Sequence, residues 1–297
     1  MSKIETPSFR FVYKKNYSIV LKKFLNNNGV SHSVLKDIRK YKSGLFVNGH
    51  NVYDNFQLHK GDVIDLVLPP ECSNRMVMIS DDDLNICYED DNVLIINKEA
   101  GVASIPSKYY SNDTLVNRVK GYLINNGCIF QIPHIVTRLD KGTSGLVIFA
   151  KNKLMHAFLS NRVKSNLVKE YYALVEGNGL LNHGFINAPI GRDPNSIIKR
   201  QVINCGKSSY TEYWLLGEFN NKSLVKIRLH SGRTHQIRVH FSYIGHPLVN
   251  DLLYGGKDYG IRYQALTCYK VTFNNVFDNE KISIKINLPQ QISNLIY

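Results

Sequence analysis

A proline-bearing, acidic connection divides the sequence and limits how the chain can fold. It begins with two consecutive prolines and continues to the acidic run Asp81–Asp83, a composition typical of a linker. The chain has 297 residues, and a single hydrophobic core stops growing near roughly 250–300 residues. We therefore predict a small domain over residues 1–70, a linker over 71–85 and a larger domain over 86–297.

Composition and charge narrow the class of function. Apolar residues make up 43% of the chain, which excludes a disordered protein. The 37 Lys and Arg against 24 Asp and Glu leave a net charge of +13, so a polyanion is the natural partner, although a basic surface unrelated to chemistry would give the same balance.

No apolar run reaches the ~18 residues of a spanning helix and no signal peptide is evident, so we expect a cytoplasmic protein without a membrane partner. The five cysteines form no C-x-x-C pair, so neither disulfides nor a zinc knuckle is indicated.

Residues 17–68 have the pattern of two helices followed by a hairpin. Apolar residues at helical spacing predict a first helix that Gly29 can end and a second helix through Ile38. The dipeptide Asn48–Gly49 predicts a tight turn, because both residues accept positive φ angles. One helical surface is basic, either as a solvated face or as a contact for RNA, with the cations Lys22, Lys23, Lys36, Arg39, Lys40 and Lys42. This order of elements resembles the small S-four-type RNA-binding domain, the alpha-L motif.

The part after the connection is rich in short apolar runs. They predict strands over Val93–Asn97, Leu146–Ala150, Tyr172–Val175, Thr211–Leu216 and Leu224–Leu229. A helix is predicted near Leu154–Lys164. We therefore expect an α+β domain in this part of the chain.

The segment HIVTRLDKGTSGLVIFAKN, residues 134–152, places charged residues between two buried strands. The apolar approach ends in a polar loop that holds Arg138, Asp140 and Lys141, and the chain returns as the strand LVIFA. A carboxylate next to cations on a loop between rigid strands is typical of a functional site. The alternative is structural, with Asp140 capping the turn and pairing with Arg138.

A second segment, LHSGRTHQIRVHFSYIGHPLVNDLLYGG, predicts a helix that carries a cation away from its apolar side. Thr234 is the candidate N-cap and Gly245 ends the helix. Arg238 lies on a different face from the apolar stripe, which consists of Ile237, Phe241 and Ile244. It is therefore available to an anion or a carboxylate, unless it is an exposed Arg with a solvated head.

The histidines of this segment do not have the spacing of a metal site. His235 and His240 are five residues apart, which directs them about 140° away from each other on a helix. A two-histidine zinc helix needs an i, i+4 pair. The sequence also lacks a P-loop, a dinucleotide-binding glycine motif and a G-x-S-x-G elbow, so nucleotide hydrolysis, hydride transfer and serine hydrolysis have no supporting motif.

A third segment, VKEYYALVEG at residues 168–177, contains two adjacent aromatic residues. In a strand, Tyr171 and Tyr172 point to opposite faces. The inward ring either packs in the core or forms a wall on which a base stacks.

Together these segments resemble the RluA-type family of RNA pseudouridine synthases. TRLDKGTSGL is similar to the family pattern H-R-L-D-x-x-T-S-G-L, GRTHQIRVH to G-R-[TS]-H-Q-[IL]-R-V-H, and GHPLVND to G-H-P-x-x-x-D. YEDDNVLIINKEAG and VKEYYALVEG resemble the family's opening strand with its N-K-P-x-G turn and its K-x-Y-x-A-x-V-x-G segment. The likeness covers residues 86 to 289 in the family's order. Three positions depart from the pattern, Thr137, Glu99 and Asn250, where many members have His, Pro and Gly.

The resemblance implies an isomerase that detaches uracil from the ribose at nitrogen, rotates it and reattaches it through carbon, without a cofactor or a metal. By the same resemblance Asp140 is the catalytic nucleophile. Arg138 would hold the opened RNA helix or replace the flipped base, and Tyr171 would pack on the target base. Arg238 would pair with Asp140, and Ile237 of the same motif is assigned to the substrate-binding residues.

We therefore expect a catalytic domain with a mixed, largely antiparallel sheet, preceded by a small αα-hairpin RNA-binding domain. The expected partner is structured ribosomal RNA of the large subunit, with no role for DNA, and transfer RNA is the alternative substrate. A different class of function is also open, a ribosome-assembly factor that binds RNA without catalysing a reaction. The presence of all four matched residues, from Arg138 to Arg238, favours the enzyme.

Overall fold

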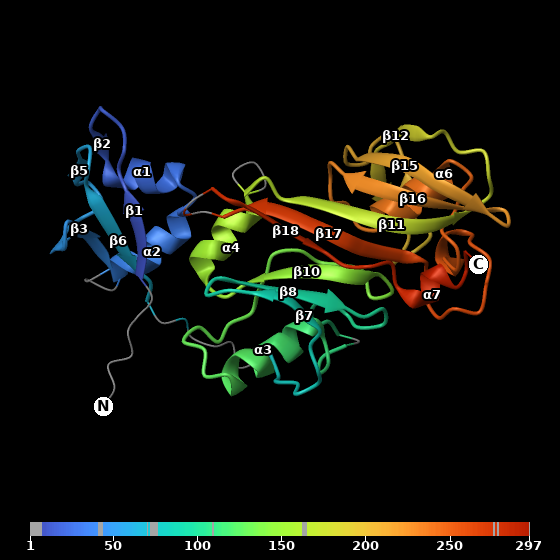
Figure 1. Cartoon of the computed structure of the whole chain (residues 1–297), viewed down its shortest axis with the longest axis horizontal. Helices are drawn as coiled ribbons and strands as arrows, with labels where there is room; N and C mark the ends of the chain where they lie inside the picture. Colours follow the sequence, from blue (N-terminus) through green and yellow to red (C-terminus); the bar gives the residue numbers. More distant parts are fainter. Residues whose placement is uncertain are drawn as a thin grey trace.

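The computed structural model describes residues 8–40, 44–69, 71, 77–108, 110–161, 165–275, 277 and 279–296. A small N-terminal unit lies at one end of the molecule, and a larger unit built on a long sheet makes up the rest (Figure 1). Each has a cluster of buried apolar residues, and the cluster of the N-terminal unit also includes Phe130 and Leu154 of the larger unit. No helix within the described ranges is long and apolar enough to cross a membrane.

The N-terminal unit packs two helices against a four-stranded sheet in the order β1-β6-β3-β4, with β2 and β5 paired separately. The predicted turn is confirmed, because Asn48 and Gly49 have φ angles of 50° and 80°. The strand β1 precedes the predicted pattern and was not expected. Lys42 lies outside the described residues. The elements are β1 Ser8–Val12, β2 Ile19–Val20, α1 Leu21–Asn27, α2 His32–Lys40, β3 Leu45–Val47, β4 His50–Asn51, β5 Gln57–Leu58 and β6 Val63–Val67.

The larger unit is built on one sheet with the main order β12-β15-β16-β11-β17-β10-β8-β7, to which β9 and β18 are added. All its strand pairs are antiparallel except that of β10 with β17. The largely antiparallel α+β fold is therefore confirmed. The strands are β7 Ile86–Glu89, β8 Val93–Lys98, β9 His134–Ile135, β10 Ser144–Ala150, β11 Val168–Glu176, β12 His183–Asn187, β15 Tyr210–Phe219, β16 Lys222–Leu229, β17 Leu266–Asn274 and β18 Lys281–Lys285.

Short helices and one small hairpin complete this unit. The predicted helix near 154–164 is α4, which ends at Ser160, and residues 162–164 lie outside the described part of the chain. Its N-cap Asn152 accepts a hydrogen bond from the Met155 amide at 2.9 Å. The remaining elements are α3 Leu115–Asn125, α4 Lys153–Ser160, β13 Ile190–Arg192, β14 Arg200–Val202, α6 Gln236–Tyr243, the 3₁₀ turn η1 Leu252–Tyr254 and α7 Gln290–Ser293.

The strand β17 joins the two halves of the large sheet, and the sequence pattern did not predict it. It pairs with β11 on one side and with the start of β10 on the other (Figure 1). At the second junction Gly145 has a φ of 107°, and an added β-carbon would lie 2.3 Å from the Cys268 carbonyl oxygen. Only glycine suits this close approach. The junction places the end of the 136–143 loop one strand away from β11, across β17.

Candidate active site

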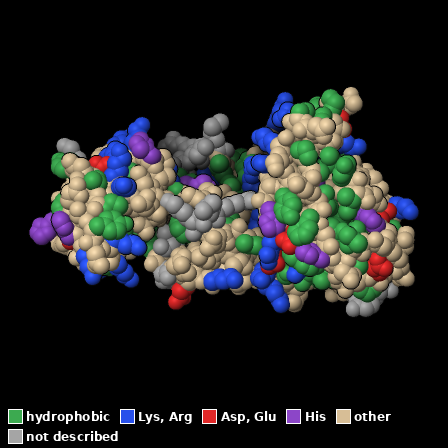
Figure 2. Space-filling view, turned by 90° about the horizontal axis from the view of Figure 1, so that it is seen from above, with side chains coloured by type: hydrophobic (Ala, Val, Ile, Leu, Met, Phe, Trp, Pro, Cys, Tyr) green, Lys and Arg blue, Asp and Glu red, His purple; other side chains and the backbone are tan. Residues whose placement is uncertain are grey.

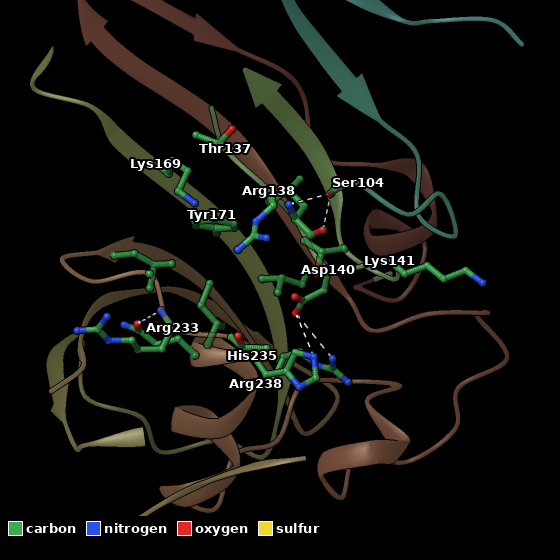
Figure 3. Close-up of a pocket in the computed structure, with 18 of the residues that line it drawn as sticks. Ser104, Thr137, Arg138, Asp140, Lys141, Lys169, Tyr171, Arg233, His235 and Arg238 are labelled. Atoms are coloured by element: carbon green, nitrogen blue, oxygen red, sulfur yellow. Dashed lines mark hydrogen bonds and ion pairs between the residues drawn. The ribbon is translucent and has the colours of Figure 1, made fainter. Parts of the chain in front are cut away.

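The loop before β10, the strand β11 and the start of α6 with the segment before it line a cavity of about 600 Å³. This volume is within the range of small-molecule sites, about 300–1,000 Å³. All five sequence-predicted site residues line this cavity: Arg138, Asp140, Tyr171, Ile237 and Arg238. Figure 3 labels four of them, Arg138, Asp140, Tyr171 and Arg238. They come from three segments that are separated in the sequence but adjacent in the fold.

A reciprocal pair of hydrogen bonds orients the loop that carries Asp140. The Ser104 hydroxyl donates to the Leu139 carbonyl at 2.6 Å and accepts from the Leu139 amide at 3.1 Å. The Leu139 side chain is buried, whereas Arg138 is exposed and Asp140 half-buried. The backbone of Leu139 is thus anchored, and the two polar neighbours are left to face the cavity (Figure 3).

Backbone groups close the turn that follows Asp140. The Thr143 amide donates to the Asp140 carbonyl at 3.0 Å. The Lys98 ammonium, which is almost fully buried, donates to the carbonyls of Glu99, Val102 and Lys141 at 2.8, 2.9 and 3.2 Å. Burial lowers the pKa of Lys98 to about 7, although the negative charges of Asp140 and Glu99 act in the opposite direction. The buried Lys98 amine therefore supports the loop from behind through these hydrogen bonds.

Two donors face one oxygen of the Asp140 carboxylate. Arg238 Nη1 lies 3.8 Å from Asp140 Oδ2, and His235 Nε2 lies 3.9 Å from the same atom. The Asp140 side chain keeps 32% of its surface exposed, toward the cavity. The structural alternative, a carboxylate that pairs with Arg138, is wrong within the described residues, because its ionic neighbours are Arg238 and His235.

The closest partner of Arg238 is Asp251, which sequence reasoning did not assign. Arg238 Nε and Nη2 donate to the two carboxylate oxygens of Asp251, both at 2.7 Å. Burial disfavours the charged guanidinium, but the hydrogen bonds and the charge of Asp251 outweigh it and raise the pKa of Arg238. Asp251 is the last residue of the GHPLVND motif, so the motif carried the signal. The pair holds Arg238 as a permanent cation behind Asp140.

The predicted N-cap Thr234 is wrong, because the helix α6 has His235 at this position. Gln236 instead organises the loop: its side-chain oxygen accepts from the Ser231 hydroxyl at 2.8 Å and from the Arg233 amide at 3.0 Å. The next histidine, His240, points elsewhere, to the Ala188 carbonyl at 2.9 Å. The described residues contain no group of three His, Cys, Asp or Glu side chains placed to bind a metal ion.

The tyrosine pair of β11 divides between the two faces of the sheet, as predicted. Tyr171 is buried and lines the cavity, with Lys169 Nζ 5.7 Å from its ring centre. Tyr172 stacks on Tyr269 on the other face, with the ring centres 3.8 Å apart. Tyr171 therefore offers an aromatic wall to the cavity.

Two of the three departures from the family pattern have a structural explanation. Asn250 has a φ of 63°, a left-handed conformation that Asn and Gly adopt more readily than other residues. Thr137 is buried, and its hydroxyl accepts a hydrogen bond from the Ile148 amide at 3.0 Å. Nothing in the structure explains Glu99, whose side chain is exposed.

Comparison with known proteins agrees with this geometry. Residues 92–243 match the family model described as RNA pseudouridylate synthase. The chain is 37% identical over 279 residues to the uncharacterized RNA pseudouridine synthase YjbO of Bacillus subtilis, covering 94% of this chain and 98% of that protein. It is 36% identical over 231 residues to the ribosomal large subunit pseudouridine synthase D of Buchnera aphidicola, covering 72% of each. The solved structure of human RNA pseudouridylate synthase domain containing 1 aligns with a TM-score of 0.57 and 25% identity, covering 70% of this chain and 84% of that one.

The fold, the cavity and these matches define the chain as an RNA-modifying isomerase that converts uridine to pseudouridine. Specifically, it belongs to the RluA-type family of RNA pseudouridine synthases, as its sequence motifs predicted.

Proposed function

We propose that this enzyme isomerises uridines in structured ribosomal RNA of the large subunit, with Asp140 as its nucleophile. The distribution of charge in the cavity carries this proposal. Asp140 is the one carboxylate among the described residues that line it, whereas five cations do so: Arg138, Lys141, Lys169, Arg233 and Arg238. The RNA backbone is an anion, so these cations would attract a nucleotide toward a single reactive carboxylate.

The proposed reaction needs no group beyond the side chains of the cavity. One oxygen of Asp140 attacks C1′ of the ribose while the C1′–N1 bond breaks, and uracil departs with the electron pair of that bond. The base then turns, its C5 bonds to C1′, and the ester bond to Asp140 breaks to restore the carboxylate. Loss of the proton from C5 and gain of one at N1 leave product and substrate with the same atoms.

The mouth of the cavity suits a base that has left its helix. A paired uridine must be extruded before its glycosidic bond can be reached. Arg138 is exposed and adjacent to Asp140 in the chain, and it would fill the vacated position. Tyr171 and Ile237, both buried in the wall of the cavity, would contact the extruded base.

The N-terminal unit is proposed as an RNA-binding domain of the S-four type. Lys22 and Lys23 on α1 and Lys36 and Lys40 on α2 are exposed, and Lys and Arg side chains are spread over this unit in Figure 2. Arg39 is partly engaged by an ion pair with Asp54. Phosphate contacts from such helices would add affinity for RNA without reading its sequence.

Release of tritium from RNA labelled at uridine carbon 5 tests the proposal, because the new carbon bond expels that hydrogen. We expect release from unmodified large-subunit ribosomal RNA and a loss of at least about 10³-fold in the Asp140→Asn variant, which retains the shape of the side chain. RNA binding by this variant should stay within about twofold, because only the reacting oxygen is changed.

Two other outcomes would change the proposal. Release from transfer RNA alone would replace the substrate, and no release from either RNA by the native enzyme would favour an RNA-binding factor. Unchanged turnover in Asp140→Asn would exclude the nucleophile.

A further inference from the structure

His235 has a backbone conformation that is uncommon for residues with a β-carbon. Its φ and ψ angles are 57° and 21°, in the left-handed region, directly before the first turn of α6. A residue with a β-carbon takes this conformation at a cost and keeps it only where surrounding contacts impose it. The contacts of its side chain indicate what the conformation achieves.

The imidazole is held between Tyr254 and Asp140. The side chain is only 12% exposed. Nδ1 lies 2.7 Å from the Tyr254 hydroxyl, which also accepts a hydrogen bond from the Arg200 amide at 2.9 Å. On the opposite side of the ring, Nε2 lies 3.9 Å from Asp140 Oδ2 (Figure 3).

These contacts favour one tautomer of the ring. The Tyr254 oxygen already accepts a hydrogen bond from the Arg200 amide and still has its own proton to donate, so we assign that proton to the bond with Nδ1. A neutral imidazole that accepts at Nδ1 carries its proton at Nε2, the atom that faces Asp140. Burial lowers the pKa of His235, with the charge of Arg238 acting in the same direction and those of Asp140 and Asp251 opposing it. Burial therefore favours the neutral form of the ring.

We propose that His235, oriented by Tyr254, is a positioning residue that directs its neutral N–H at one oxygen of Asp140 and leaves the other oxygen to react. This inference rests on the proposed role of Asp140. Both close contacts of the carboxylate are made to the same oxygen, Oδ2, by His235 and by Arg238. The second oxygen is free of these two donors and is the one that attacks C1′.

Tyr254 contacts both of the side chains that face Asp140. Its hydroxyl contacts His235, and the Arg238 guanidinium lies over its ring at 4.9 Å. Arg238 contributes a charge, whereas His235 contributes a neutral donor. The neutral donor orients the carboxylate without adding a second positive charge that would weaken it as a nucleophile.

Two substitutions of similar length separate donation from packing. His235→Gln retains an N–H at the end of the side chain, whereas His235→Met has none, and both meet the same backbone constraint. We expect kcat for tritium release to fall about 10²-fold in His235→Met and about 10-fold in His235→Gln, with KM for RNA within about twofold. His183→Met, a half-exposed histidine outside the cavity, is the control and should retain full activity.

Tyr254→Phe tests the second half of the inference, because it removes the hydroxyl and keeps the ring beside Arg238. If Tyr254 acts through His235, the variant with both Tyr254→Phe and His235→Met loses no more activity than His235→Met alone. Losses that multiply would show that the two residues act independently and overturn this part.

Equal losses in the Met and Gln variants, or a change in KM alone, would overturn the role of His235 as a donor. Thermal unfolding of each variant checks that it folds. If Asp140→Asn is inactive and His235→Met is fully active, only the present inference fails. If Asp140→Asn retains turnover, the proposed nucleophile itself fails.

Discussion

The basic side chains buried beside the loop of Asp140 and those on the surface of the N-terminal unit are held in different ways. Arg238 is buried with two hydrogen bonds to Asp251, and Lys98 is buried against three carbonyls. Lys23 and Lys36, by contrast, stand exposed on α1 and α2. Buried partners fix a side chain in place, as a reaction requires, whereas mobile surface charges suit contact with an RNA backbone of variable shape.

Among the variants that test this contrast, the one that removes the carboxylate partner of Arg238 should lose the most stability and activity. Asp251→Asn leaves a buried guanidinium without its carboxylate, and breaking a buried pair in this way costs about 3–5 kcal/mol. We expect that loss in the free energy of unfolding, measured in urea, together with a fall in tritium release.

Asp258→Asn is the matched control for this change. Asp258 is exposed and accepts a hydrogen bond from the Gly260 amide, which Asn can also do. The control should stay within about 0.5 kcal/mol of the native enzyme. An Asp251→Asn variant that is equally stable would show that Arg238 does not depend on this partner.

Lys98 differs from Arg238, because it is buried without a carboxylate partner in hydrogen-bond contact. Its burial should therefore make native stability depend on pH. Its folded pKa of about 7 is below that of an unfolded lysine, so between these two values the unfolded chain binds more protons. Native stability should therefore gain up to about 1.4 kcal/mol per pH unit from this group as the pH rises above 7.

The Lys98→Met variant cannot make this gain, and all other titrating groups are common to both proteins. Unfolding in urea at several pH values should show the stability of the native enzyme rising relative to the variant. Parallel curves for the two proteins would mean that Lys98 titrates normally in the fold.

Charge reversal at the exposed lysines of the N-terminal unit should have the smallest effect of these changes. Lys23→Glu combined with Lys36→Glu should weaken RNA binding about tenfold and flatten the slope of log affinity against log salt by about 1.5, because two phosphate contacts are lost. Turnover at saturating RNA should not change. Lys281→Glu with Lys285→Glu, exposed on β18, is the control pair, and an equal loss there would point to net charge rather than to a binding face.

The sequence predicted individual strands and turns better than it predicted which of them pair with one another. The strands around 146–150 and 224–229 and the turn at Asn48–Gly49 were predicted because local apolar periodicity and turn chemistry specify them. The strand β17 was missed, although it joins the two halves of the sheet. Its neighbours are distant in the sequence, so no local pattern reports its place.

The residues around Asp140 show the same division. The motif with Arg138 and Asp140 was visible in the sequence, and so was the helix with Arg238. The bidentate pair with Asp251 and the contact between His235 and Tyr254 were not predicted. They depend on side chains that meet only when the segment before α6 and the turn η1 pack together.

The sequence by itself determined the α+β class, the basic character of the chain and the motifs that mark its family, because composition, periodicity and spacing are local properties. Only the tertiary structure decided which oxygen of Asp140 is held, which carboxylate binds Arg238 and how β17 brings the loop of Asp140 to Tyr171. These are distances between segments remote in the chain, and they are set by packing around the shared core rather than by neighbouring residues.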